Sequence, residues 1–265
     1  MRSSTNKLTS WGWSRIPIGQ ICAVLAALVC WLPAVGGANA AVISEADLKA
    51  RIEAATKDLK DLSMTANVVE VDRRAMEKLD ANYTRMLELK SAKITLKLPD
   101  KVKVDGKLGM VRFEYIINGT IKISRAPAIR FKQRNDYTGD PAKLQGPFDM
   151  GIVTTSLWQN RKIGVLDDPT AAANGEIKLR LQWLKGDMVY YAWLDEKNLW
   201  LKRVEKYDSR GSLRAKSVYS NARNLGGSIW APTTVELFAP DGSRAGKTEM
   251  VDIKYNSGVQ DSLFQ

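Results

Sequence analysis

The first regular pattern after residue 40 is helical. Apolar positions recur at alternating steps of four and three, at Leu48, Ile52, Ala55, Leu59 and Leu62. This spacing places them on one face of a helix. Ser44 followed by Asp47 is an N-cap signature. The pattern predicts one amphipathic helix over about 45–61, with its Leu48, Ile52 and Leu59 face packed on the concave side of a sheet.

From residue 93 the period changes to two. Ile94, Leu96 and Leu98 alternate with lysine and threonine, which is the pattern of a half-buried strand. Asp-Gly and Asn-Gly pairs are turn signals. We expect strands at 93–98, 102–104, 111–117 and 121–124, with turns at Asp105-Gly106 and Asn118-Gly119.

Residues 125–175 follow no strand period and contain four prolines. Phe148, Ile152, Val153 and Leu157 fit a short helix over 149–158, which would act as a lid. Asp168 to Gly175 has the composition of a loop.

Short strands then resume at a regular spacing, with tight turns between them. We expect strands at 177–183, 188–194, 199–207, 213–219, 229–238 and 247–255. Such spacing is typical of an antiparallel meander that curls into a barrel or part of one. The fold class expected is mainly β with α: an incomplete antiparallel β-barrel closed by the N-terminal helix and the short lid helix. Residues 41–265 are expected to form a single domain.

The first forty residues read as a cleavable secretory signal. They carry three basic residues and no acidic residue, an apolar run from Ile21 to Leu32, and the small-residue end Ala38-Asn39-Ala40. Cleavage is expected between Ala40 and Ala41, which predicts export. The apolar run is shorter than the 18 or more residues typical of a membrane span.

Composition limits the chemistry of the exported chain. Both cysteines, Cys22 and Cys30, lie in the predicted signal, and the sequence has no histidine. Pairs of serine or cysteine with histidine, and metal sites with histidine ligands, are therefore excluded. Removing the signal leaves 37 basic against 29 acidic residues, a formal charge of +8. This charge favours anionic membranes or acidic partners, while export argues against nucleic acid.

Carboxylates are the remaining candidates for catalysis. A pair of them facing one cleft could cleave glycosides. Solvated faces are the ordinary explanation for the acidic residues in predicted strands and turns, which are Glu114, Glu176, Asp195, Glu205 and Glu236. Asp167-Asp168 lacks calcium-loop spacing and fits a turn better than a cation site. We expect no enzyme activity, no cofactor and no metal.

Aromatic residues gather in the C-terminal meander. Five tryptophans follow residue 40, and four of them lie between 183 and 230. A curled sheet and a helix can enclose an apolar cavity. We expect the lining of such a hollow to include Phe148, Leu157, Trp183 and Trp193. The alternative is that these side chains fill a solid core.

The chain resembles the outer-membrane lipoprotein-sorting (LolA/LolB-like) family. The resemblance extends loosely to the helix and the Leu98-Pro99-Asp100-Lys101 junction. It is carried best by Trp193-Leu194-Asp195, Leu201-Lys202-Arg203, Tyr207 to Gly211, Trp230-Ala231-Pro232-Thr233, Asn256 and Asp261-Ser262-Leu263-Phe264.

The resemblance implies an open barrel whose apolar hollow shelters acyl chains across the periplasm, without cofactor or catalysis. Each buried methylene contributes about 0.8 kcal/mol to such binding. The family's carriers have a latch arginine directly before the proline of the strand junction, where this chain has Leu98.

The leading hypothesis is therefore a monomeric periplasmic carrier or chaperone. It would bind lipoprotein acyl chains or another lipid and would meet sorting proteins of the inner or outer membrane. Two alternatives stay open. One is a sensor or interaction module that uses the same fold to bind a partner by its surface. The other is an enzyme with two carboxylates in one cleft.

Overall fold

Fifteen strands and several short helices make up the described part of the protein. The computed structural model describes residues 42–80, 83 and 87–265, so the predicted signal lies outside the described residues. Helices α1, α2 and α4 span Glu45–Thr56, Arg73–Met76 and Pro169–Ala173. Five 3-10 helices, η1 to η5, span Pro127–Ile129, Pro141–Lys143, Pro147–Met150, Thr155–Trp158 and Asp261–Phe264.

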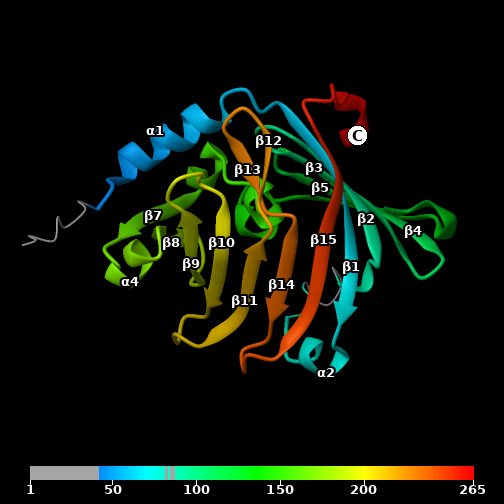
Figure 1. The fold of residues 1–265 in the computed structure, drawn as a ribbon. Helices are drawn as coiled ribbons and strands as arrows, with labels where there is room; N and C mark the ends of the chain where they lie inside the picture. Colours follow the sequence, from blue (N-terminus) through cyan, green and yellow to red (C-terminus); the bar gives the residue numbers. More distant parts are fainter. Residues whose placement is uncertain (1–41, 81–82, 84–86) are drawn as a thin grey trace, which may run out of the picture. The chain divides into compact units, whose positions relative to one another are not determined.

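Thirteen strands form one antiparallel sheet, shown in Figure 1. Their order across the sheet is β6-β5-β4-β3-β2-β1-β15-β14-β11-β10-β9-β8-β7. The two edge strands, β6 and β7, are neighbours in sequence but not in the sheet, so the sheet is open. The fold class predicted from the sequence, an incomplete curled barrel, is confirmed.

The strand bounds show which parts of the sequence build this sheet. In chain order from β1 to β8 they are Asp61–Val71, Ser91–Lys97, Lys101–Leu108, Val111–Asn118, Ile121–Ala126, Phe131–Asp136, Arg161–Leu166 and Glu176–Trp183. From β9 to β15 they are Val189–Asp195, Leu201–Tyr207, Leu213–Ser220, Arg223–Gly226, Ile229–Ala231, Thr234–Phe238 and Arg244–Tyr255. Strands β12 and β13 form a separate two-stranded sheet.

One face of the large sheet is apolar, and we call it the inner face. Along β2 and β3 the buried side chains Ile94, Leu96, Val102 and Val104 alternate with lysines and polar residues. On β8 the same parity holds for the buried residues at 177, 179 and 181. Since neighbouring side chains of a strand point to opposite faces, the other, outer face carries most of the charged residues of these strands.

Helix α1 begins where the sequence predicts. The Ser44 side chain accepts a hydrogen bond from the Asp47 backbone N–H at 3.0 Å, and Leu48 and Ile52 are almost fully buried. The helix ends at Thr56, earlier than the expected 61, because the chain turns and β1 begins at Asp61. Leu62 therefore belongs to the sheet, and its fit to the helical spacing is fortuitous.

Several other sequence predictions are wrong in detail. Strand β3 runs through Asp105-Gly106 instead of turning there, and the chain turns at residues 109–110. The predicted strand 229–238 is two strands, β13 and β14, separated at Pro232, since proline cannot donate a ladder hydrogen bond. Residues 168–175 contain the one-turn helix α4, whose N-cap Asp168 accepts from the Ala171 N–H.

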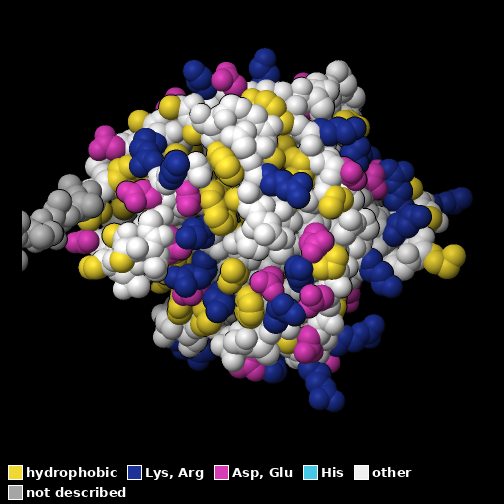
Figure 2. All heavy atoms as spheres, viewed as in Figure 1, with side chains coloured by type: hydrophobic (Ala, Val, Ile, Leu, Met, Phe, Trp, Pro, Cys, Tyr) yellow, Lys and Arg dark blue, Asp and Glu magenta, His cyan; other side chains and the backbone are white. Residues whose placement is uncertain are grey.

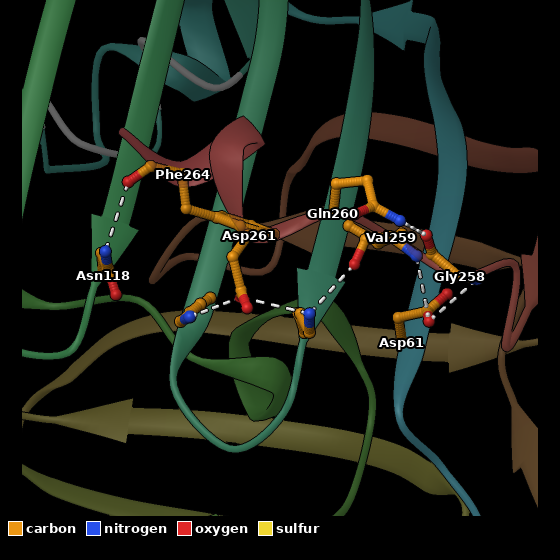
Figure 3. Close-up of polar contacts among 9 residues, drawn as sticks. Asp61, Asn118, Gly258, Val259, Gln260, Asp261 and Phe264 are labelled. Atoms are coloured by element: carbon orange, nitrogen blue, oxygen red, sulfur yellow. Dashed lines mark hydrogen bonds and ion pairs between the residues drawn. The ribbon is translucent and has the colours of Figure 1, made fainter.

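The chain's last residues cross the outer side of β1 to β4, as Figure 3 shows. The buried Asp61 carboxylate accepts hydrogen bonds from the backbone N–H groups of Ser257, Gly258 and Val259, at 2.7 to 3.2 Å. Asp261 lies between the ammonium groups of Lys97 and Lys101, at 3.1 and 2.6 Å. This segment therefore ties β1 to the turn between β2 and β3.

Candidate functional site

Residues 144–158, which we call the cover segment, lie on the inner face. Two apolar clusters meet there, and the segment contributes to both. Met150 and Ile152 pack in the first cluster, with β1 to β4 and the β12–β13 hairpin. Phe148, Val153 and Leu157 pack in the second, with α1 and β8 to β11. The segment thus covers the apolar face between the two halves of the sheet.

The cover segment is not one helix as predicted but two 3-10 helices, η3 and η4. Gly151 separates η3 from the residues before η4, with φ of 80°. A Cβ at this position would lie 2.9 Å from Pro232 Cγ and 3.3 Å from Tyr219 Cε1. Only glycine fits both the backbone conformation and this close approach.

The structure brings three of the four predicted lining residues to the inner face. Phe148 and Leu157 belong to the same cluster, and Leu157 is fully buried. Trp183 shares the inner parity of β8 but lies at the strand's end, where the Arg161 guanidinium stacks over its ring at 3.8 Å. Whether these residues contact a ligand stays a prediction.

Trp193 lies on the other face, so its predicted position in a hollow is wrong. It pairs with Lys178 across β8 and β9, and with Arg203 across β9 and β10. The Arg203 guanidinium lies 3.7 Å from the ring centroid and the Lys178 ammonium 5.1 Å away. Strand parity is the reason, since Ala192 and Leu194 take the inner positions of β9.

Sequence reasoning missed Tyr190 and Tyr219 as inner-face residues. Both pack on or in the second cluster, and burial raises the pKa of each phenol. The alternation of Tyr190, Ala192 and Leu194 along β9 is the pattern that could have identified Tyr190 as an inner-face residue. The signal for Tyr219 is weaker, because the preceding residue of the same parity on β11 is the polar Ser217.

The cover segment contains one charged group, Asp149, and lies beside another, Arg161 of β7. Asp149 in η3 accepts a hydrogen bond from the Gly146 N–H at 2.8 Å. Its surroundings desolvate the carboxyl and raise its pKa, while the charge of Arg161 acts in the opposite direction. Desolvation lowers the pKa of Arg161, and Asp149 opposes this change. The guanidinium also donates to the Leu157 carbonyl at 3.3 Å, which links β7 to η4.

A cleft of about 530 Å³ opens beside the cover segment, between the end of α1, the β2–β3 turn and η4. Leu59, Leu98 and Pro99 supply its apolar lining. Leu98 packs against the first cluster. Its backbone N–H donates to the Lys60 carbonyl at 2.9 Å. The other lining residues are Glu53, Thr56, Lys57, Lys60, Lys97, Thr154, Thr155, Ser156 and Gln159.

Four of the five acidic residues weighed as catalytic groups have cationic partners, and the fifth, Asp195, accepts a hydrogen bond from the Asn198 N–H at 2.7 Å. Buried Glu114 contacts Lys103, Arg112 and Arg125. Glu236 pairs with Arg244 at 2.6 Å. Figure 2 shows that acidic and basic side chains intermix on the face of the molecule it presents. Within residues 42–80, 83 and 87–265, no three potential metal-ligating side chains are grouped together.

Comparisons with known proteins identify the fold. No protein-family model matches the chain, and no curated protein sequence is significantly similar to it.

None of the helices in the described ranges is long and apolar enough to cross a membrane.

Solved structures do match. A structure described as an outer membrane lipoprotein-sorting protein domain from Vibrio parahaemolyticus has a TM-score of 0.58 at 12% identity, and covers 82% of this chain and 94% of its own. A LolA superfamily protein from Nitrosomonas europaea has 0.56 at 13%, with 84% and 98% covered. A DUF1329 family protein from Desulfovibrio piger has 0.51 at 13%, with 83% and 95% covered. The chain therefore shares the fold of these three solved structures.

Proposed function

We propose that this protein is a non-enzymatic periplasmic carrier or chaperone. It binds lipoprotein acyl chains or another lipid against the inner face of its sheet. The observation that supports this most is how the inner face is covered. Where the two apolar clusters of the inner face meet, the irregular cover segment packs on the sheet, with the short β12–β13 hairpin in the first cluster and α1 in the second.

The cover segment is held in a way that allows exchange. Among the described residues, its backbone–backbone hydrogen bonds are local, such as Gly151 N–H to Phe148 O at 3.0 Å and Leu157 N–H to Thr154 O at 3.0 Å. Its attachment to the sheet consists mainly of apolar side-chain contacts. Segments attached in this way open at lower free energy than strands of a sheet ladder. Acyl chains can replace the same apolar contacts when the segment moves away.

Leu157 illustrates what this implies for the unliganded state. Its complete burial is what a filled core produces. The cover segment therefore occupies the place where the ligand would bind, and binding requires displacement of the segment.

Native mass spectrometry tests this proposal. Protein purified from its own periplasm without a delipidation step is expected to retain mass corresponding to a lipid or lipopeptide. The purified chain should also bind a fluorescent fatty-acyl probe at micromolar concentration. Loss of both signals would contradict lipid binding, and a co-purifying protein without lipid would favour the sensor or interaction module.

A further inference from the structure

The 530 Å³ cleft beside the cover segment is built of two chemically different walls. Leu59, Leu98 and Pro99 are apolar, and Leu59 and Leu98 are continuous with the first cluster. The cleft is also lined by three hydroxyl-bearing residues of the cover segment, Thr154, Thr155 and Ser156. Its volume lies in the range of about 300 to 1,000 Å³ that is typical of small-molecule sites.

The charge at this cleft is positive. Lys57, Lys60 and Lys97 line it, together with one acidic residue, Glu53. Lys97 shares Asp261 with Lys101 and donates to the Val259 carbonyl at 3.0 Å. Lys57 and Lys60 have no ion pair with any other described residue, so two exposed ammonium groups stand at the rim without an internal counter-ion.

The backbone that carries the lysines is held in place outside the cover segment. The Lys60 N–H donates to the Asn256 side chain at 2.8 Å, and its carbonyl accepts from Leu98. The contacts of Lys97 with the C-terminal segment hold the adjoining turn. Placing these lysines at a ligand therefore costs little ordering of their backbone.

We propose that this cleft binds the anionic headgroup of an amphiphile, a phosphate or carboxylate attached to an acyl chain. The two free lysines and the hydroxyls contact the headgroup. The apolar wall leads the chain toward the seam between the clusters, where Ile152 and Val153 of the cover segment diverge to opposite sides. This inference rests on the proposed function and adds a preference for charge.

Titration calorimetry with three probes tests the charge preference. The probes are dodecyl phosphate, uncharged dodecyl maltoside and inorganic phosphate. The two amphiphiles are added below the concentration at which they form micelles. Dodecyl phosphate is expected to bind about tenfold more tightly than dodecyl maltoside, the effect of two moderately screened charge contacts. This ratio should fall as salt is added. Inorganic phosphate should bind much more weakly than either amphiphile.

The double variant Lys57→Gln/Lys60→Gln should lose the tenfold preference and still bind dodecyl maltoside as the parent does. The control, Lys49→Gln/Lys132→Gln, removes the same charge from exposed positions outside the cleft and should keep the preference. All four lysines are exposed, so both variants are expected to melt as the parent does.

Three results would overturn the inference. They are equal binding of the two amphiphiles by the parent, an unchanged preference in Lys57→Gln/Lys60→Gln, and inorganic phosphate binding as tightly as dodecyl phosphate. Each of these three results would leave the proposed lipid-binding function intact, provided that dodecyl maltoside still binds. If no amphiphile binds, the proposed function fails with it.

Discussion

At Gly151 the backbone of the cover segment packs closely against the side chains of Pro232 and Tyr219. The φ of 80° at Gly151 and the 2.9 Å approach to Pro232 leave no room for a methyl group. If the cover segment and an acyl ligand compete for the inner face, a substitution that weakens the packing of the segment should strengthen binding of the ligand. In a solid core with no ligand, the same change would only destabilise the fold.

We therefore predict opposite effects of Gly151→Ala on stability and on binding. The free energy of unfolding should fall by about 1–3 kcal/mol, through backbone strain and overpacking. Affinity for a fatty-acyl probe should rise. Urea unfolding and probe fluorescence measure the two quantities, and Gly139→Ala, where a Cβ meets nothing within 4 Å, is the control. Weaker probe binding by Gly151→Ala would contradict competition.

Glu114 is a residue whose role is structural and depends on pH. Burial alone would raise the pKa of its carboxyl, but the hydrogen bond from Arg125 and the charges of Lys103 and Arg125 outweigh it, so the pKa lies below its usual value. A lowered folded-state pKa contributes stability that is complete above the unfolded pKa of about 4.3 and is lost as pH falls through the folded value.

Glu114→Gln should lower the free energy of unfolding at neutral pH by about 1–3 kcal/mol, since it leaves Lys103 and Arg125 without their anion. The difference between parent and variant should shrink below about pH 4. Urea unfolding at a series of pH values measures this. Glu249→Gln, which changes a pair with Lys247 that is more exposed than the Glu114 cluster, should cost much less. A difference that stays constant with pH would show that the carboxylate charge is not the cause.

At the scale of elements, α1 is the helix whose docking the sequence predicted most directly. Leu48 and Ile52 are in the second cluster together with the cover segment. The helix therefore packs partly on a movable element, and the Trp158 indole N–H donates to Glu45 at 2.9 Å. The packing of α1 on the inner face and the packing of the cover segment there should therefore stabilise each other.

Ile52→Asp places a charge in this apolar seat and should cost about 3–5 kcal/mol or more. Ala50→Asp, at an exposed position of the same helix, should cost less than about 1 kcal/mol, mainly through helix propensity. Thermal melting of the two variants decides the matter. An Ile52→Asp protein that melts within a degree or two of the parent would mean that this face of α1 is not docked.

The C-terminal segment is an element that only the structure reveals as part of the site. Asp61 and Asp261 hold it across β1 to β4, and it in turn holds the turn that carries Leu98. The residues that this segment contacts cannot be recognised from the sequence, because partners such as Asp61 and Gly258 are nearly 200 positions apart.

For the whole molecule, local patterns predicted most strands of the meander and the open antiparallel architecture. Strand β1 was missed although Leu62, Met64 and Ala66 alternate with polar residues, because Leu62 also completes the helical spacing. Strand β6 was missed because most of its residues are exposed and show no apolar alternation. Strand β7 was missed although Ile163 and Val165 alternate along it and pack on the second cluster, because it lies within the irregular, proline-containing region 125–175.

The candidate site was predicted only in part, for a similar reason. Phe148 and Leu157 were identified because they stand out as apolar residues in an irregular region. Trp193 was misplaced because β9 has aromatic residues on both faces, and the choice between faces is made by pairing with Lys178 and Arg203. The cleft joins residues 53–60, 97–99 and 154–159, and no local pattern links these three stretches.

The central claim is that acyl chains bind the inner face by displacing the cover segment. Amide hydrogen exchange with and without a saturating fatty-acyl ligand tests it most directly. We predict that amides in 144–158 exchange faster when the ligand is bound, while those of the central strands β1, β14 and β15 keep their protection. Unchanged or slower exchange throughout 144–158 in the presence of bound ligand would contradict the claim.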